Sequence, residues 1–233
     1  NMRSTYAKSD QVRFYPQFLR ELGYYCTNNK KEDYNIDGGQ LSGIWDESSD
    51  QAHYKNRKPG QPFFAIFNTT LSHEHVIHES IPDNALRHDP KKMSIPPYHP
   101  RTPEMEHDWA QYYDYIERMD AWVGEQLKEL EENGLLENTI VFYYADHGGI
   151  LGRSKRYIYE SGTRIPLIVR IPDKYKHLFP NMGKGTKVDR LISLVDLAPT
   201  LLSIAGIPKP AYMQGNAFLG HDKTEDPEYV YMF

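Results

Sequence analysis

Residues 139–166 read TIVFYYADHGGILGRSKRYIYESGTRIP, and this stretch decides the fold. The apolar run TIVFYYA predicts a buried strand, and a second apolar run, IPLIVRI at residues 165–171, predicts another. Asp146 and His147 stand where the first run ends, and Gly148 lets the backbone turn tightly beside a bound group. The stretch therefore predicts a buried strand whose carboxyl end carries polar chemistry.

Further strands and helices are expected around this stretch. The run QPFFAIFN at residues 61–68 predicts a third strand that is covered on both faces. A long helix is predicted to end at Asn133-Gly134, because apolar residues recur before it at three- and four-residue spacing: Tyr112, Tyr115, Ile116, Met119, Trp122, Val123, Leu127 and Leu130. Shorter elements are expected at residues 12–22 (helix), 24–27 (strand) and 193–205 (helix). Strands separated by helices and long loops predict an α/β fold with a covered, largely parallel sheet.

The composition bounds the function. A chain of 233 residues, 39% of them hydrophobic, suffices for one sizeable α/β domain, alone or with a small appendage. The net charge of −5 argues against a general nucleic-acid binder. No apolar stretch approaches the roughly 20 residues that span a bilayer. The single cysteine, Cys26, has no neighbouring histidine, and we expect it to pack in or near a strand.

Polar clusters follow two of the predicted strands, and ligands of such sheets gather at the carboxyl ends of the strands. One cluster is Ser72-His73-Glu74, and the other begins with Asp146 and His147. The Asp146 carboxylate suits a hard divalent cation, and the His147 imidazole suits the same ion or a ligand. The alternative is a strand-ending turn with a solvated histidine.

The loop after residue 148 is basic. The ammonium of Lys155 suits a tetrahedral anion, as does the patch that it forms with Arg153 and Arg156. The alternative is a solvated basic loop. Glu160 and Arg164 are expected to pair and to hold the loop.

Several histidines allow a different interpretation. His73, His75 and His78 have H-x-H-x-x-H spacing, which permits a zinc site, although one of them facing a ligand is the favoured prediction. The segment at residues 83–103 holds five prolines and is predicted to be a long surface loop that shapes a saccharide subsite or is ordinary surface. His88, His99 and His107, in and after this loop, are expected to be exposed.

Four segments together resemble one family. GQPFFAIFNTTLSHE, DYIERMDAWVGEQLKELEENGLLENTIVFYYADHG, GRSKRYIYESGTRIPLIV and LISLVDLAPTLLSIAGIP are similar, in this order, to segments of the type I sulfatases of the alkaline phosphatase superfamily. The resemblance covers most of residues 14–219. It implies an α/β fold in which helices flank both faces of a mostly parallel central sheet. It also implies a hydrolase that removes sulfate from a sulfated, usually carbohydrate, substrate.

The resemblance assigns roles to five residues. His73 matches the histidine that contacts the sulfate or the bridging oxygen, and Lys155 matches the sulfate-binding lysine. Asp146 and His147 match half of the metal-binding set, which in the family holds Ca²⁺ and sometimes Mg²⁺ or Mn²⁺. Lys31 resembles the lysine of a Gly-Lys-x-His segment, and it is expected to act in catalysis and substrate binding with His73 and Lys155.

The match at Lys31 is imperfect, because Lys30 stands where glycine is usual and Asp33 where histidine is usual. The family's nucleophile, a formylglycine, forms in a Cys/Ser-x-Pro-x-Arg segment that these residues lack. We therefore expect residues 1–233 to be part of a single sulfatase catalytic domain, without its N-terminal part and C-terminal end, and inactive alone.

Alternatives remain open at this stage. A phosphodiester or phosphonate monoester hydrolase of the same superfamily would share the Asp-His-Gly segment, and a sulfatase-like fold that only binds anionic glycans is a non-catalytic alternative. The expected partner is a small-molecule or saccharide sulfate ester, with no nucleic acid and no membrane. By resemblance the protein is periplasmic, secreted or lysosomal, and the sequence predicts no oligomeric state.

Overall fold

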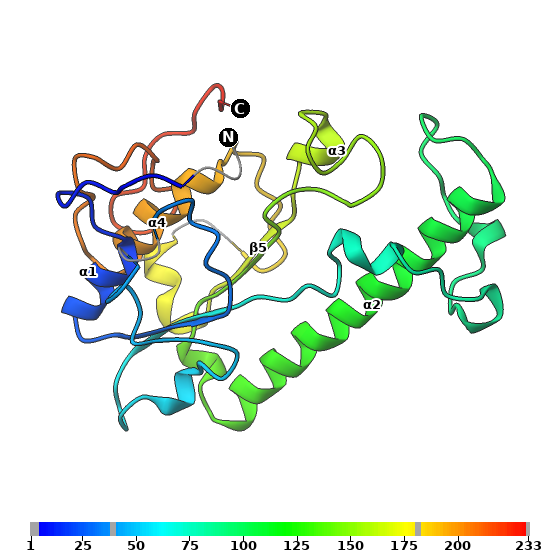
Figure 1. Cartoon of the computed structure of the whole chain (residues 1–233). Helices are drawn as coiled ribbons and strands as arrows, with labels where there is room; N and C mark the ends of the chain where they lie inside the picture. The colour runs from blue at the N-terminus through cyan, green and yellow to red at the C-terminus, as the bar shows by residue number, and fades with distance from the viewer. Residues whose placement is uncertain (1–4, 38–40, 180–182, 232–233) are drawn as a thin grey trace. The chain divides into compact units, whose positions relative to one another are not determined.

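The structure is a computed structural model that describes residues 5–37, 41–179 and 183–231. The described residues form two compact units (Figure 1). The first unit joins residues 5–68 to residues 178–231, and the second consists of Thr69–His177. Each unit is described by itself below.

The first unit is built on a parallel sheet. Strand β1 (Tyr25–Asn29) lies between β2 (Glu47–Ser48) and β3 (Phe63–Phe67), and both neighbours run parallel to it. In this register Cys26 stands opposite Phe64. The strands predicted at residues 61–68 and 24–27 are both confirmed. The covering of both faces predicted for the first of them is not, because every residue of β3 is only partly buried.

Two helices far apart in the sequence share the core of this unit. Helix α1 (Tyr15–Glu21) and helix α4 (Leu197–Ile204) contact each other (Figure 1). Leu19, Cys26 and Leu202 form the buried cluster between helices and sheet. Burial raises the pKa of the Cys26 thiol to about 12, so Cys26 packs as predicted and is not a nucleophile at neutral pH.

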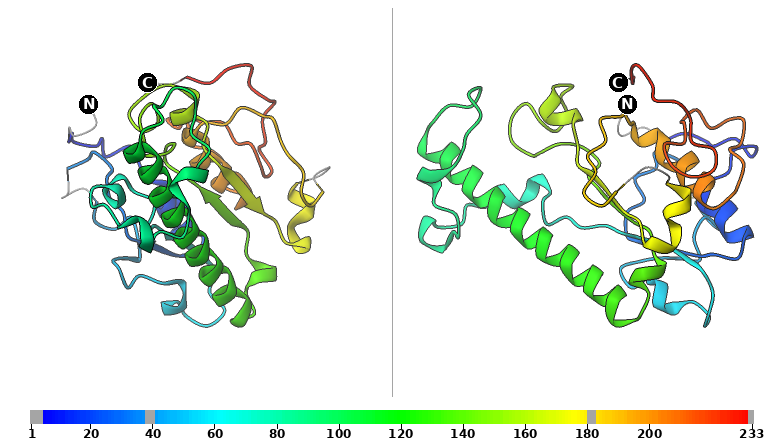
Figure 2. Two further views of the ribbon diagram at one scale, coloured as in Figure 1. Left: turned by 90° about the vertical axis from the view of Figure 1, so that its right-hand side faces the viewer. Right: turned by 180° about the vertical axis from the view of Figure 1, so that it is seen from behind.

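The second unit is organised by helix α2 (Pro103–Glu132), the long green helix in Figure 2. Thr102 caps its N-terminus, because its hydroxyl accepts a hydrogen bond from Met105 N at 3.3 Å. The helix ends at Asn133 and Gly134, where Gly134 adopts a left-handed φ of 67°. The predicted C-terminus of the helix is confirmed. The helix begins at Pro103, well before the periodic apolar residues, because Thr102 and Pro103 at the end of the proline-rich segment form a helix start.

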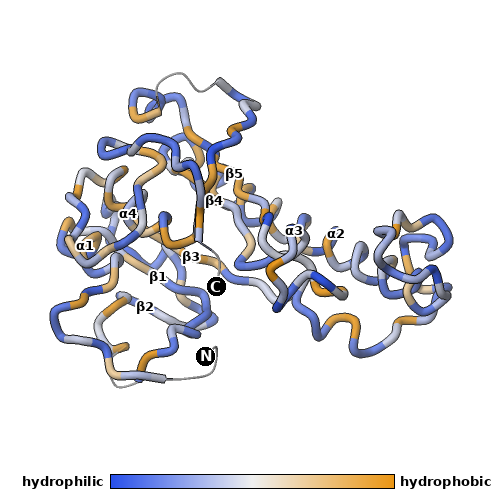
Figure 3. The backbone as a smooth tube through the Cα atoms, turned by 90° about the horizontal axis from the view of Figure 1, so that it is seen from above, coloured by the Kyte–Doolittle hydropathy of each residue, from blue (hydrophilic) through white to orange (hydrophobic). Residues whose placement is uncertain are grey.

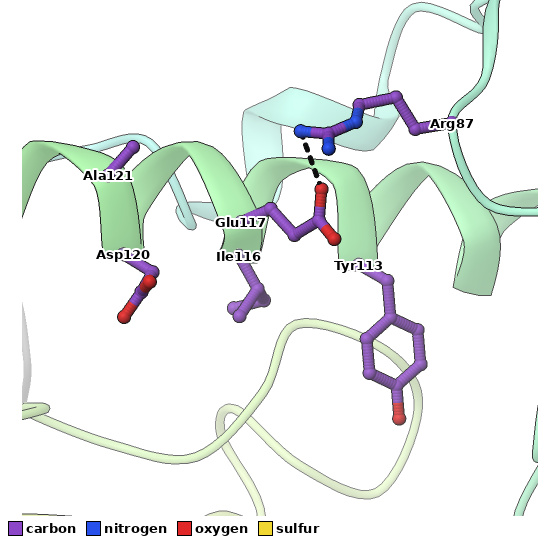
Figure 4. Close-up of a pocket in the computed structure, with 6 residues that line it drawn as sticks. All are labelled: Arg87, Tyr113, Ile116, Glu117, Asp120 and Ala121. Atoms are coloured by element: carbon purple, nitrogen blue, oxygen red, sulfur yellow. Dashed lines mark ion pairs between the residues drawn. The ribbon is translucent and has the colours of Figure 1, made fainter.

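Buried polar side chains of α2 hold the preceding loop. Asp114 is 2% exposed and accepts hydrogen bonds from Arg87 N at 2.9 Å and from His88 N at 3.1 Å. Gln111 is 1% exposed and bonds the same loop. Arg87 Nη1 lies 2.7 Å from Glu117 Oε2. Figure 4 shows this pair among the residues that line a pocket on the helix. The loop is therefore fixed by buried hydrogen bonds.

The prediction that three histidines are exposed was wrong. All three side chains are partly buried and hydrogen-bonded: His88 to Asp114, His99 to Trp109 and Gly152, and His107 to the carbonyl of Ile81. The proline-rich composition indicated a loop, but it did not reveal that the loop folds back on α2.

Strands β4 (Val141–Tyr144) and β5 (Leu167–Arg170) form an antiparallel pair, visible as neighbouring arrows in Figure 2. An irregular loop with a single helical turn, α3 (Glu160–Thr163), joins them. Both strands are apolar (Figure 3). They are only half-buried, however, so the complete covering predicted from composition is not seen in this chain.

The remaining regular segments are short 3₁₀ turns: Tyr54–Asn56, Glu74–Ile77, Asp83–Ala85, Pro90–Lys92, Leu136–Asn138, Asp173–Leu178 and Leu194–Asp196. The last of these turns leads into α4, and Pro199 lies in the first turn of α4. Among the described helices, none combines the length and apolar character that crossing a bilayer requires.

A backbone contact closes the β4–β5 loop at its base. Gly148 N donates a hydrogen bond to Gly162 O at 2.9 Å. A Cβ atom at Gly148 would lie 1.9 Å from Ser161 O, and one at Gly162 would lie 2.4 Å from Ser154 O. We call this glycine pair the neck of the loop. Only glycine permits so close an approach of the two backbones.

Replacing Gly162 with alanine tests the neck. We expect Gly162→Ala to lower the free energy of unfolding of the complete protein by about 1–3 kcal/mol, because the added methyl group overlaps backbone oxygens. The matched control is Gly124→Ala on α2, where a Cβ meets nothing within 4 Å. The control should raise stability by up to about 1 kcal/mol. Denaturant titration measures both, and equal effects of the two changes would contradict the account.

Candidate active site

The second unit brings together two residues that are 82 positions apart in the sequence. Lys155 Nζ lies 3.2 Å from His73 Nε2. His73 precedes the 3₁₀ turn Glu74–Ile77, and Lys155 belongs to the loop above the neck. His73 and Lys155 are two of the three residues predicted to bind the substrate, and the structure places these two side by side.

Backbone geometry directs Lys155 toward His73. Lys155 N donates a hydrogen bond to Gly149 O at 2.9 Å. Arg153 and Arg156, which flank Lys155, adopt left-handed φ angles of 66° and 73°. Non-glycine residues adopt this conformation only where surrounding contacts compensate for its cost, and such positions cluster at functional sites. The loop thus turns sharply on both sides of Lys155, whose side chain is 18% exposed.

Glu74 anchors the basic loop. Its Oε1 atom lies 2.7 Å from Arg156 Nη2 and 3.5 Å from Lys155 Nζ. The hydrogen bond from Arg156 is the main reason that the pKa of Glu74 is lowered to about 2, and the charges of both cations lower it further. The sequence analysis did not assign Glu74 to the site. Two sequence features could have pointed to Glu74: it directly follows His73, and the basic cluster at residues 153–156 needs an acidic partner.

The environment of His73 favours its neutral form. Partial burial lowers the pKa of His73 most, and the positive charge of Lys155 lowers it further, while Glu74 acts in the opposite direction. Nδ1 of His73 lies 2.9 Å from Nδ1 of His75. Lys155 Nζ donates to Nε2 of His73, and the backbone N–H of His75 donates to Nδ1 at 3.4 Å, so both ring nitrogens of His73 lie beside a hydrogen-bond donor.

Asp146 and His147 follow β4 as the sequence indicated. His147 Nδ1 donates to the carbonyl of Gly148 at 2.8 Å, which leaves Nε2 as the ligand nitrogen. That Nε2 lies 3.6 Å from Asp146 Oδ1, close enough for both atoms to bind one ion. His147 also contributes to the electrostatic environment of His73. This donor set, a carboxylate oxygen and an imidazole nitrogen, fits part of a divalent-cation site.

A zinc site built on His73, His75 and His78 has no support in the geometry. Throughout residues 5–37, 41–179 and 183–231, no group of three or more His, Cys, Asp or Glu side chains is arranged to hold a metal ion. Asp146 and His147 therefore form a pair that needs further ligands to complete a coordination shell.

Lys31 lies in the first unit, after β1. Buried Asn28 orients its backbone, since Asn28 Nδ2 donates to Lys31 O at 2.9 Å. The side chain of Lys31 is exposed. The contacts that unite His73 and Lys155 do not include Lys31, so its role stays a prediction.

The predicted pairing of Glu160 with Arg164 is confirmed. Arg164 Nη1 lies 2.8 Å from Glu160 Oε1 within the turn α3. The pair is exposed, so it orients the return of the loop toward β5 without adding much stability.

The sulfatase family profile matches residues 2–207. The chain belongs to the sulfatase family. The family generally uses a divalent metal ion, which agrees with the chemistry of the donor pair Asp146 and His147.

Relatives in the sulfatase family include an ulvan-active sulfatase, an N-sulphoglucosamine sulphohydrolase and enzymes named arylsulfatase K. An ulvan-active sulfatase from Formosa agariphila is 41% identical over 254 aligned positions, which cover 94% of this chain. Human N-sulphoglucosamine sulphohydrolase is 35% identical over 57% of this chain and 25% of its own length. The chain spans 41% of the length of the ulvan-active sulfatase.

The fold is shared with a solved structure of a protein in complex with its substrate D-glucosamine-2-N,6-O-disulfate. The TM-score is 0.64 at 17% sequence identity, over 99% of this chain and 68% of that one. At this identity the likeness shows the fold alone. It confirms the predicted α/β, sulfatase-like fold class.

Two substitutions should move the pKa of His73 in opposite directions. Lys155→Met removes a neighbouring positive charge and is expected to raise this pKa, whereas Glu74→Gln removes a negative charge and is expected to lower it further. Titration of the imidazole by NMR in the complete protein measures both shifts. Shifts in the same direction, or no shift in either variant, would show that these side chains do not surround His73.

Proposed function

We propose that the chain supplies part of the catalytic centre of a sulfuric ester hydrolase that acts on a sulfated carbohydrate. The observation that carries the proposal is the contact between His73 and Lys155, which unites the family-matched histidine and lysine across 82 positions. An imidazole beside an ammonium group provides a proton and positive charge at one place. A sulfate ester requires both when its S–O bond breaks.

Lys155 binds a sulfate oxygen in this proposal. Its ammonium is partly buried and held by Glu74, so its charge is positioned before the substrate arrives. A group pre-oriented in this way stabilises negative charge that builds up on the sulfate without having to reorganise. Arg156 pairs with Glu74 at the shorter distance and holds the anchor in place.

His73 protonates the departing sugar oxygen. Its lowered pKa makes the free site neutral, and an incoming sulfate brings negative charge that raises this pKa. The imidazolium therefore forms when substrate is bound. As the S–O bond breaks, its electron pair passes to the sugar oxygen, which takes the proton from His73.

Asp146 and His147 hold part of the metal site. When bound there, a divalent cation, which we propose is Ca²⁺ with Mg²⁺ or Mn²⁺ as alternatives, supplies positive charge beside the sulfate oxygens. The bond from His147 Nδ1 to Gly148 O keeps Nε2 available as a ligand. The 233 residues hold no Cys/Ser-x-Pro-x-Arg segment, so this chain's residues provide charge and a proton and not the formylglycine nucleophile.

We extend the proposal to the rest of the chain. Residues 1–233 belong to a single catalytic domain, and Lys31 contributes a further positive charge to the substrate. The names of the relatives support a sulfated saccharide as the partner. A periplasmic, secreted or lysosomal location is the corresponding prediction.

Replacement of His73 or Lys155 with alanine tests the function. In the complete enzyme, each change is expected to lower kcat on a sulfated oligosaccharide by about 10²–10⁴-fold, because each removes charge or a proton needed in the transition state. Lys128→Ala, an exposed lysine on α2 that pairs with Glu132, is the control and should leave kcat unchanged. Sulfate release measured at saturating substrate gives kcat.

Three outcomes would contradict the proposal. Faster turnover of an aryl phosphodiester than of an aryl sulfate, by orders of magnitude, would favour the phosphodiester or phosphonate hydrolase. Glycan binding without any turnover by the parent enzyme would favour a binding protein. An active parent whose kcat survives both alanine changes would remove His73 and Lys155 from the chemistry.

A further inference from the structure

A surface hollow lies beside the loop that carries Lys155. It has a volume of about 650 Å³ and is lined by Tyr98, Arg153, Tyr159, Glu160, Ser161 and Arg164. These residues come from the proline-rich segment and from the β4–β5 loop of the same unit. Apart from Arg153, which belongs to the basic patch predicted to suit an anion, none of them has a role in the sulfate chemistry described above.

Arg153 is oriented across this hollow by two aromatic rings. Its guanidinium carbon lies 3.9 Å from the ring centroid of Tyr159 and 4.8 Å from that of Tyr98. No ion pair joins Arg153 to a carboxylate within the described parts of the chain. An arginine held by rings rather than by an acid keeps its hydrogen-bond donors available for an anion.

Both walls of the hollow are anchored. His99, next to Tyr98, donates from Nε2 to Gly152 O at 2.9 Å and accepts from Trp109 Nε1 at 3.2 Å. The proline-rich loop is thereby tied both to helix α2 and to the residue before Arg153. On the other side, the hydroxyl of Ser161 donates to Arg153 O at 2.6 Å. The hollow is therefore built from fixed backbone.

Large apolar and aromatic side chains in and beside the hollow are open to solvent. Tyr157, Ile158 and Tyr159 are 55%, 71% and 47% exposed, and Tyr98 is 40% exposed. The rings of Tyr157 and Tyr159 are stacked with centroids 6.1 Å apart. Exposed apolar surface next to a polar site marks a binding surface. Ring faces of this kind fit the C–H face of a sugar.

From these contacts we infer that the hollow is a subsite for an anionic sugar next to the sugar that carries the reactive sulfate. Arg153 binds the carboxylate or sulfate group of the neighbouring sugar, and Tyr98 packs on the ring of that sugar. Arg153 precedes Lys155 by only two residues, so one rigid loop serves both sugars. The inference rests on the proposed function.

Selectivity between saccharides tests the subsite. Three disaccharides carry the same reactive sulfate, next to a uronate, a sulfated sugar or a neutral sugar. In the complete enzyme, Arg153→Met should lower the ratio of kcat/KM for an anionic over the neutral neighbour by about tenfold, because the methionine keeps the apolar stem and loses the charge. The uronate and sulfated substrates then identify which anion is bound.

The matched control is Arg118→Met. Arg118 also lies over a tyrosine, 4.5 Å from the ring centroid of Tyr115, but on α2 and outside the hollow. It should leave the ratio unchanged. Tyr98→Leu, on the opposite wall from Arg153, is a second variant in case Arg153→Met disturbs the loop, and it should raise KM for all three disaccharides.

The outcomes separate the two proposals. An active parent whose ratio is the same in Arg153→Met and in Arg118→Met overturns the subsite alone. A parent that hydrolyses none of the sulfates overturns the proposed function, and calorimetric binding of the desulfated anionic disaccharide then decides the subsite. Binding about tenfold weaker in Arg153→Met than in the parent supports the subsite, and equal binding overturns it.

Discussion

The candidate active site depends on one close approach of backbone to backbone, at the neck formed by Gly148 and Gly162. The hydrogen bond between them brings the start and the return of the β4–β5 loop together. Asp146 and His147 stand just before the neck, and Lys155 lies in the loop that it closes. The neck thereby helps to hold Asp146, His147 and the loop that carries Lys155 at the same end of β4.

Ion pairs with Glu74 also stabilise the β4–β5 loop. A short loop with Arg153, Lys155 and Arg156 repels itself unless an acid compensates, and Glu74 compensates two of these cations. Because Glu74 directly follows His73, the same ion pairs that steady the loop also set the distance between Lys155 and His73. The ion pairs of Glu74 therefore both stabilise the loop and position Lys155 beside His73. Arg153 lies over the rings of Tyr98 and Tyr159 instead, and in our proposal it binds the neighbouring sugar.

Local patterns were sufficient to predict much of the fold. Apolar runs located β3, β4 and β5, and helical spacing with Asn133-Gly134 located the end of α2. The antiparallel pairing of β4 with β5 was not predicted, because strand direction depends on how the intervening loop returns and not on the composition of the strands. The polar contacts of His88, His99 and His107 were missed for a similar reason. They arise from a loop folding back on a helix.

The sequence indicated members of the candidate site but not the geometry in which the structure arranges them. His73, Lys155, Asp146 and His147 each stood out as polar residues after apolar runs or within a matched motif. Glu74 and the role of Tyr98 did not, because their function comes from partners distant in sequence. The left-handed backbone at Arg153 and Arg156 could not be predicted from the residue type, because arginine does not favour this conformation.

A crystal structure of the complete protein with bound sulfate tests the central claim most directly. The account predicts one sulfate within hydrogen-bonding distance of both Lys155 Nζ and His73 Nε2. It also predicts a divalent cation on Asp146 and His147 that touches the same sulfate. A sulfate bound away from Lys155 and His73, or a cation bound elsewhere with Asp146 facing solvent, would contradict it.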